Sequence, residues 1–120
     1  MRHRKKLKKL GRPTAHRIAM LKNQVNDLFL SGSITTTEAK ARETRRMAEK
    51  TLTIAKEGTL DAKRRVRKVI NDPDAFQMIF NEYVPKYATR PGGYVKIIKL
   101  PPRRGDAAKM AMLAFVEEND

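Results

Sequence analysis

The stretch YVKIIKLPPRRGDAAKMAMLAFV, residues 94–116, decides the fold class of this chain. Val, Ile and aromatic residues dominate its first part, Tyr94–Leu100, and this composition is typical of a strand that the following two prolines close. A second apolar run, Lys109–Val116, follows a loop that contains Gly105. Periodicity alone also allows a helix for this second run. We favour a strand, because pairing across the glycine loop forms a hairpin and adds a sheet to an otherwise helical chain.

Amphipathic helices are predicted before the hairpin. Thr14 can cap the first of them, which ends at Ser31 and Gly32 and has apolar residues spaced by three and four positions on one side. Its predicted core residues are Ile18, Leu21, Val25, Leu28 and Phe29. The β-branched run Ile34–Thr37 then predicts a short strand that leads directly into the second helix.

The second helix, from about Glu38 to Lys56, has small inner residues that permit close packing. Its inner face consists of Ala41, Thr44, Ala48, Leu52 and Ala55. Thr59 caps a third helix, and Asp72 followed by Pro73 opens a fourth, with proline at the first helical position. The fourth helix has the strongest apolar stripe and is predicted to stop at Pro85. That stripe consists of Phe76, Ile79, Phe80, Tyr83 and Val84.

These elements predict a two-layer α+β fold, in which about four helices pack on a small mixed three-stranded sheet with a basic extended N-terminal arm. Residues 1–13 are the predicted arm, and residues 14–120 are a single globular domain. The arm has no acidic residue, and Leu7 and Leu10 are its main apolar side chains. Because it has so little to bury, we expect it to become ordered only against a polyanion.

The charge balance requires an anionic partner. The chain has 27 Lys and Arg against 13 Asp and Glu, which gives a formal net charge of +14. Nucleic acid, an anionic membrane face or an acidic protein would each satisfy such a field, and we place nucleic acid first. No apolar run follows the basic start, and none approaches the ~20 residues of a membrane span, so we expect a soluble, cytoplasmic protein.

The titratable residues give no support for catalysis, a cofactor or a metal. With no cysteine in the chain, disulfides and thiolate zinc sites are excluded. His3 and His16 are the only histidines, and both lie among Arg and Lys, where phosphate contact is the more ordinary role. The pair Gly92–Gly93 lacks the lysine and hydroxyl of a phosphate loop and is interpreted as a turn. We therefore expect a binding protein that is not an enzyme.

Several short motifs follow one another in a specific order along the chain. They are MRHRK at the start, then Leu10, Arg12, His16, Arg17, Met20, Ile34, Thr35, Thr36, Lys40, Ala41, Arg45, Arg46, Phe80, Asn81, Glu82, Arg90, Gly92, Gly93, Tyr94, Arg104, Gly105 and Asp106. Together they resemble the family of the seventeenth protein of the bacterial large ribosomal subunit, over essentially the whole chain. Two positions depart from the family pattern: Lys109 stands where proline is common, and Ala114 replaces a usual acid. The departures leave the register of the last strand open.

The resemblance implies an α+β structural constituent of the large ribosomal subunit that binds ribosomal RNA near the nascent-chain tunnel exit. It implies no catalysis and no cofactor. The implied partners are large-subunit ribosomal RNA and neighbouring ribosomal proteins, with one copy per ribosome and no membrane or small-molecule substrate. The RNA-binding residues carried over from the family are Arg2, His3, Arg4, Lys5, Arg12, His16, Arg17, Arg45, Arg46, Arg90, Tyr94 and Arg104. We add on charge Lys6, Lys8, Lys9, Lys22, Arg42, Lys86, Lys96 and Arg103.

Two other classes of protein fit the charge less well. A free nucleic-acid-binding regulator is the alternative hypothesis. A DNA regulator, however, is expected to dimerise around a groove-reading helix, whereas the Lys and Arg residues here are spread over arm, helices and loops. A membrane-surface protein would need aromatic residues opposite its basic face, and the predicted fold places most of the aromatic residues in the core.

Overall fold

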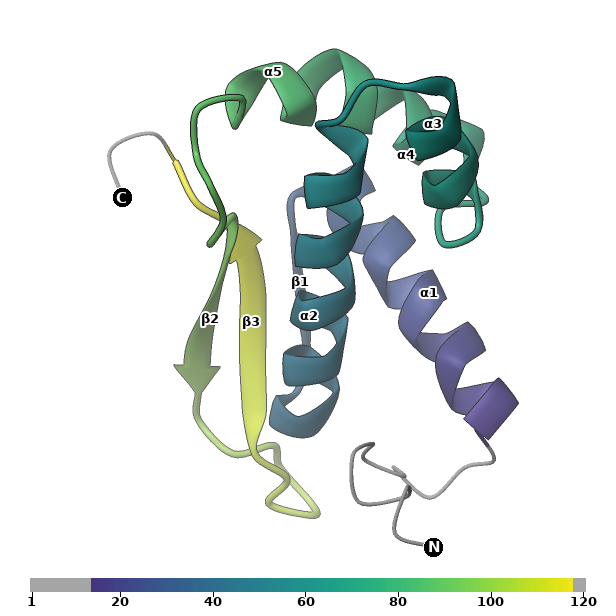
Figure 1. Cartoon of the computed structure of the whole chain (residues 1–120). Helices are drawn as coiled ribbons and strands as arrows, with labels where there is room; N and C mark the ends of the chain where they lie inside the picture. The colour runs from purple at the N-terminus through teal and green to yellow at the C-terminus, as the bar shows by residue number, and fades with distance from the viewer. Residues whose placement is uncertain (1–13, 118–120) are drawn as a thin grey trace, which may run out of the picture.

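Helices on one side of a three-stranded sheet form the part of the chain that the structure, a computed structural model, describes: residues 14–117 (Figure 1). The elements in chain order are α1 (Thr14–Ser31), β1 (Ser33–Thr37), α2 (Glu38–Ala55), α3 (Leu60–Arg67), α4 (Pro73–Met78), the π-helix η2 (Ile79–Tyr83), α5 (Val84–Lys86), β2 (Val95–Leu100) and β3 (Met110–Phe115). The predicted α+β class is confirmed. The predicted arm, residues 1–13, lies outside the described residues, and its separation as a domain stays a prediction.

The sheet is antiparallel throughout, with strand order β1-β3-β2, whereas we predicted a mixed sheet. The position where α1 ends explains this difference. Gly32, just after α1, accepts a hydrogen bond from the Phe115 amide at 3.2 Å, so β1 begins at the C-terminal end of β3 and must run against it. The second apolar run of the hairpin is a strand, and Leu113 pairs with Ile34 on one side and Ile97 on the other.

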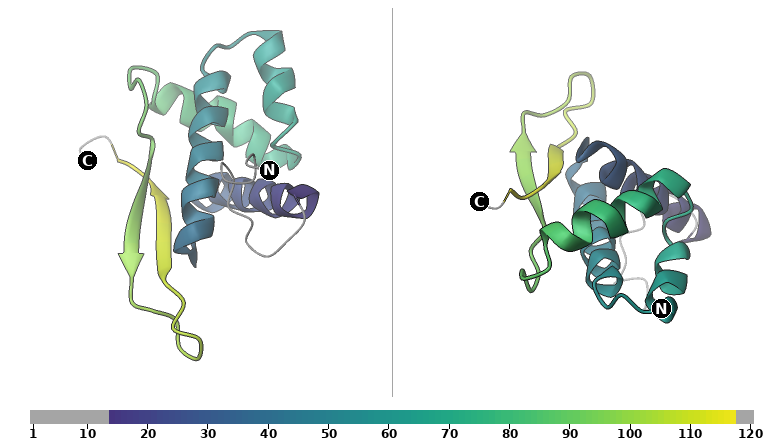
Figure 2. Two further views of the ribbon diagram at one scale, coloured as in Figure 1. Left: turned by 60° about the horizontal axis from the view of Figure 1, so that its bottom comes forward. Right: turned by 90° about the horizontal axis from the view of Figure 1, so that it is seen from above.

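The helices cover one face of the sheet, and α2 contacts all three strands (Figure 2). On β3, alternate residues point towards the helices and are buried: Ala111, Leu113 and Phe115. The intervening Met110, Met112 and Ala114 are only half-buried. The full cover of this strand is therefore on the helical side alone.

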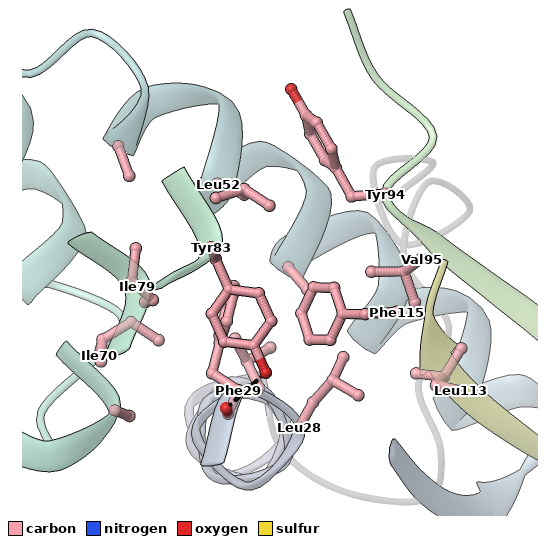
Figure 3. Packing of buried hydrophobic residues seen from close by; sticks show 14 of the residues in the cluster. Leu28, Phe29, Leu52, Ile70, Ile79, Tyr83, Tyr94, Val95, Leu113 and Phe115 are labelled. Carbon is pink, nitrogen blue, oxygen red and sulfur yellow. Dashed lines mark hydrogen bonds between the residues drawn. The ribbon is translucent and has the colours of Figure 1, made fainter. Parts of the chain in front are cut away.

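Aromatic rings from three distant segments meet in the core (Figure 3). The Phe29 ring of α1 lies 5.2 Å from Tyr83 of η2 and 5.1 Å from Phe115 of β3, measured between centroids. The Tyr83 hydroxyl donates a hydrogen bond of 2.8 Å to the Phe29 carbonyl, and burial raises the pKa of Tyr83 to about 12. This cluster joins the first helix, the π-helix and the central strand, and it confirms the predicted place of Tyr83 in the core.

Capping side chains start two of the helices as predicted. The Thr59 hydroxyl accepts a hydrogen bond from the Ala62 amide at 3.0 Å, and the Asp72 carboxylate accepts bonds from the first turn of α4. Thr37 precedes α2 with an extended backbone but makes no side-chain cap. The sharply defined first turns of α3 and α4 therefore follow from the local sequence.

The prediction that Pro85 stops the fourth helix is wrong. The helix widens to a π-helix over Ile79–Tyr83 and continues through Pro85 to Lys86. A proline inside an α-helix lacks the N–H for the carbonyl four residues earlier and clashes with it. The wider π turn, in which the Val84 amide bonds to the Ile79 carbonyl, accommodates the ring and keeps the helix continuous.

We predict that Tyr83→Phe lowers the free energy of unfolding by about 1–2 kcal/mol, because the buried Phe29 carbonyl loses a donor while the ring packing stays. Tyr83→Ala also removes the ring, and it should cost about 3–5 kcal/mol. Urea denaturation followed by circular dichroism measures both. A Tyr83→Phe protein as stable as the wild type would show that the hydroxyl contributes nothing to the core.

Candidate nucleic-acid interface

Three arginines of α2 gather beside the start of β2. Arg42, Arg45 and Arg46 line a surface hollow of about 440 Å³ that Glu49, Gly93 and Ile97 complete. We call these three arginines and their hollow the α2 notch. Arg42 and Arg46 are one turn apart on α2, so their side chains lie on the same side of the helix. The notch brings together three residues that the sequence predicted as RNA contacts.

Two side chains of α2 hold the notch against β2. The Glu49 carboxylate accepts hydrogen bonds from the Gly93 amide at 3.1 Å and the Val95 amide at 2.7 Å. The Arg45 Nε donates to the Val95 carbonyl at 2.9 Å, which orients its guanidinium. Sequence analysis did not identify the role of Glu49, because its partners lie 44 and 46 residues further along the chain.

The other two arginines of the notch form exposed ion pairs within α2. Arg42 contacts Glu38 at 2.9 Å and Arg46 contacts Glu43 at 3.2 Å, with the two arginine side chains 51% and 70% exposed. The Glu38 and Glu43 side chains are only 16% and 11% exposed, so within each pair the guanidinium is the part that a phosphate can reach.

A second basic group surrounds the turn after α5. Lys86, Tyr87, Thr89 and Arg90 line a hollow of about 260 Å³. Lys86 pairs with Glu117 at 3.3 Å, and the Arg90 Nε donates to the Gly92 carbonyl at 3.3 Å. The Arg90 carbonyl in turn accepts a hydrogen bond from Lys56. The turn is thus held by Arg90 itself and by contacts with Lys56 and Glu117, and the predicted contacts Lys86 and Arg90 lie together on it.

Tyr94 and Lys96 lie apart from these hollows. Tyr94 is fully buried, with its hydroxyl 3.0 Å from the Lys56 amine and 3.3 Å from the Thr53 hydroxyl. This places Tyr94 in the core as the bridge between α2 and the hairpin. Tyr94 was predicted to contact RNA, but its side chain has no exposed surface in the described structure. Lys96 is half-buried on β2, opposite Ala114.

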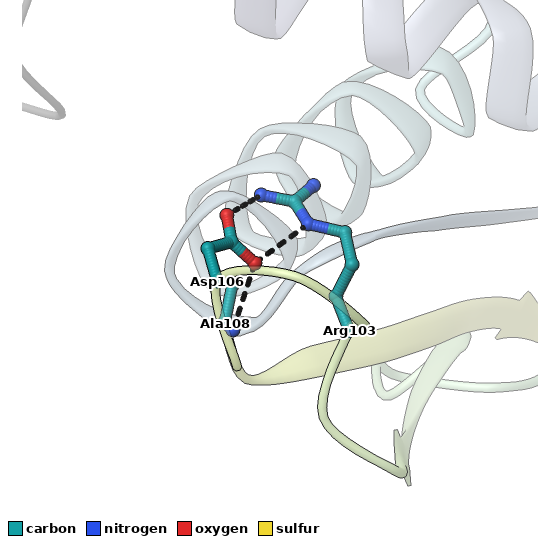
Figure 4. A network of polar contacts seen from close by, with 3 residues as sticks. All are labelled: Arg103, Asp106 and Ala108. Carbon is teal, nitrogen blue, oxygen red and sulfur yellow. Dashed lines mark hydrogen bonds and ion pairs between the residues drawn. The ribbon is translucent and has the colours of Figure 1, made fainter.

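Two neighbouring arginines of the hairpin loop have different roles, and Figure 4 shows the contacts of the first, Arg103. Arg103 binds Asp106 through two hydrogen bonds, of 2.7 and 3.2 Å, and Asp106 also accepts a bond from the Ala108 amide. The Arg103 guanidinium holds the pKa of Asp106 at about 2. Arg103 therefore shapes the loop, whereas Arg104 is exposed and makes no ion pair with a residue in the range 14–117.

On α1, the three predicted contacts differ in burial: His16 is exposed, Lys22 is half-buried and Arg17 is buried. Arg17 lines a groove between α1 and α2 together with Arg46 and Lys50. The predicted contacts of the arm lie outside the described residues: Arg2, His3, Arg4, Lys5, Lys6, Lys8, Lys9 and Arg12.

Other kinds of site find no support within residues 14–117. That range contains no group of three or more histidines and carboxylates that could hold a metal ion. None of its helices has the length and hydropathy needed to cross a membrane. What the described surface offers is a set of guanidinium and ammonium groups suited to phosphates.

Comparison with known proteins gives a consistent result. The model of the family described as Ribosomal protein L17 matches residues 20–116. A relative named large ribosomal subunit protein bL17, from Clostridioides difficile, is 52% identical over 92% of this chain and 98% of its own length. Proteins of the same name are 47% identical in Halothermothrix orenii, over 92% of this chain and 97% of theirs, and 49% identical in Chlorobium chlorochromatii, over 100% and 78%.

We predict that the Asp106 carboxylate titrates near pH 2, and that Arg103→Gln returns the midpoint towards the ordinary value of 3.8. Because its pKa is lowered in the folded chain, Asp106 stabilises the loop above about pH 3.8, and this contribution disappears as the pH falls through about 2. The ¹³C shift of the carboxyl group and the Ala108 amide shift report both. A midpoint near 3.8 in the unmodified chain would contradict the loop structure.

Proposed function

The chain belongs to the ribosomal protein L17 family, and we propose that within the large ribosomal subunit it binds ribosomal RNA through its basic N-terminal arm and the basic surface of its body. This family consists of structural proteins of the large subunit, so the chain is a component of the cytoplasmic ribosome. Its task is to stabilise RNA packing near the exit of the nascent-chain tunnel, a location that rests on the family resemblance.

The observation that carries the proposal is the α2 notch, where three arginines lie on one surface hollow. Guanidinium groups bind phosphate oxygens through two parallel hydrogen bonds, and each phosphate that is neutralised releases counterions from the RNA. Arg45 is oriented in advance by its bond to Val95, so it loses little side-chain freedom when it binds. These features favour contact with RNA phosphates over a merely solvated face.

The composition of the first 13 residues supports a separate role for the arm. Seven of its residues are Arg or Lys and none is acidic. A segment of this kind can enter a crevice between RNA helices, where its charges meet phosphates that mobile ions neutralise less well. Arm and body would then bind different RNA elements and hold their relative positions.

Sedimentation of a cell lysate tests this function. We expect the protein to migrate with large subunits at low magnesium and to remain with them after a high-salt wash. A peak at the top of the gradient, or one with the nucleoid, would overturn the ribosomal proposal and favour a free nucleic-acid-binding regulator.

Deletion of residues 2–12 should lower affinity for large-subunit ribosomal RNA and leave the fold intact, because the body has its own core. Filter binding measures the affinity, and circular dichroism checks the fold. An arm-less protein that binds as tightly as the full chain would show that the arm is not part of the interface.

Arg46→Gln should weaken RNA binding about tenfold, since a charge-assisted contact contributes about 1.5 kcal/mol. The slope of log affinity against log salt should fall by about 1. Arg65→Gln on α3 is the matched control, because Arg65 is paired with carboxylates as Arg46 is, but lies outside the notch. Equal losses in both variants would mean that net charge alone, and not the notch, determines the affinity.

A further inference from the structure

Helix α3 has a strongly basic surface that sequence analysis did not assign to RNA. Within nine residues, from Leu60 to Lys68, the chain has five bases and one acid, Asp61. Ala62 and Val66 are buried against the body, so the bases lie on the outside. They are Lys63, Arg64, Arg65, Arg67 and Lys68.

Ion pairing divides these five bases into two groups. Arg65 contacts Glu57 at 3.5 Å and Asp61 at 3.8 Å. The other four make no ion pair with any carboxylate in the range 14–117, and all four are exposed. We call these four bases, Lys63, Arg64, Arg67 and Lys68, the α3 face. They are three to five positions apart or adjacent along the helix, so neighbouring turns place them about 5–6 Å from one another.

Two half-buried aromatic rings hold part of the α3 face in position. The Arg67 guanidinium carbon lies 4.2 Å from the centroid of Phe76, and the Lys63 amine lies 5.7 Å from that of Phe80. A guanidinium stacked on a ring keeps its in-plane N–H groups available, and its conformation is already restricted. Arg67 is therefore arranged for a phosphate before any RNA arrives.

The α3 face lies far from the basic residues of the hairpin loop. In Figures 1 and 2 α3 is at one end of the molecule, and the β2–β3 hairpin loop with Arg104 is at the opposite end. Between them runs α2, which packs against both α3 and the sheet. A single local RNA contact would use one of these ends only.

We propose that the α3 face binds the phosphates of a second RNA segment, so that the body joins two RNA segments at its opposite ends. This inference rests on the proposed function and deepens it. The regularly spaced phosphates of an RNA strand fit four basic side chains that have no ion-pair partner in the range 14–117 and lie on neighbouring turns of α3. Each contact with a phosphate adds to the salt dependence of binding. An acidic protein segment is the competing occupant, and the experiments below separate the two.

Matched charge substitutions on one helix test the proposal. Arg64→Gln removes a basic side chain that forms no ion pair within residues 14–117, whereas Arg65→Gln removes one that is ion-paired. Each substitution changes the net charge of the chain by one. With transcribed large-subunit ribosomal RNA as the probe, Arg64→Gln should lower affinity about five- to tenfold and the salt slope by about 1. Arg65→Gln should change both only slightly. Arg64 is not stacked on a ring, so its loss should leave the fold intact.

The absence of cysteine allows a single directed probe to be placed at either end of the molecule. A hydroxyl-radical source attached to Lys68→Cys cleaves RNA that lies near the α3 face, and the same source on Arg104→Cys cleaves RNA near the hairpin loop. We expect two separate sets of cleavage sites on the probe RNA. At an RNA concentration that saturates both variants, this readout reports the location of the RNA and not the affinity.

The outcomes distinguish the failure of this inference from the failure of the proposed function. Cleavage from position 104 without cleavage from position 68, together with equal effects of the two arginine substitutions, would overturn the α3 contact and leave RNA binding by the notch and arm standing. That result would point to an acidic protein on α3. Absence of cleavage from both positions, with no RNA binding by the unmodified chain, would overturn the proposed function as well.

Discussion

Burial of one face of β3 is the constraint on which the described structure depends. Leu113 and Phe115 must be covered, and the strand must be paired along both edges. The first requirement places α2 across the sheet, and the second brings β1 and β2 to either side. Phe115 then meets Phe29 and Tyr83, so the most distant parts of the described chain share one core.

The same packing determines how the charges are presented. The basic residues of the described helices and strands are attached to elements that the core holds in place, and part of the charge in the range 14–117 is satisfied internally. Arg103 and Arg65 bind carboxylates, whereas Arg45 is directed by a backbone carbonyl of the hairpin. The described body therefore presents its Lys and Arg side chains as separate groups on different elements. This arrangement is suited to several RNA segments and poorly suited to reading one duplex groove.

Several features were predictable because their causes are local. Thr59 and Asp72 start helices through bonds to their own first turns, and the small inner face of α2 follows from spacing alone. The path of the chain through Pro85 was not predictable, because the core cluster around Tyr83 keeps the helix intact where the local rule favours a stop. The same limit applies to Tyr94, an aromatic residue after a glycine turn whose buried hydroxyl finds Lys56 across the fold.

The sequence by itself determined the α+β class, the order of the elements and the large positive net charge, because periodicity, capping and net charge are properties of nearby residues or of composition. Only the tertiary structure decided the antiparallel pairing of β1 and the clamp of Glu49 on the hairpin. Those depend on contacts between residues tens of positions apart, such as Glu49 with Val95. Such contacts arise when the core closes, and no local pattern in the chain encodes them.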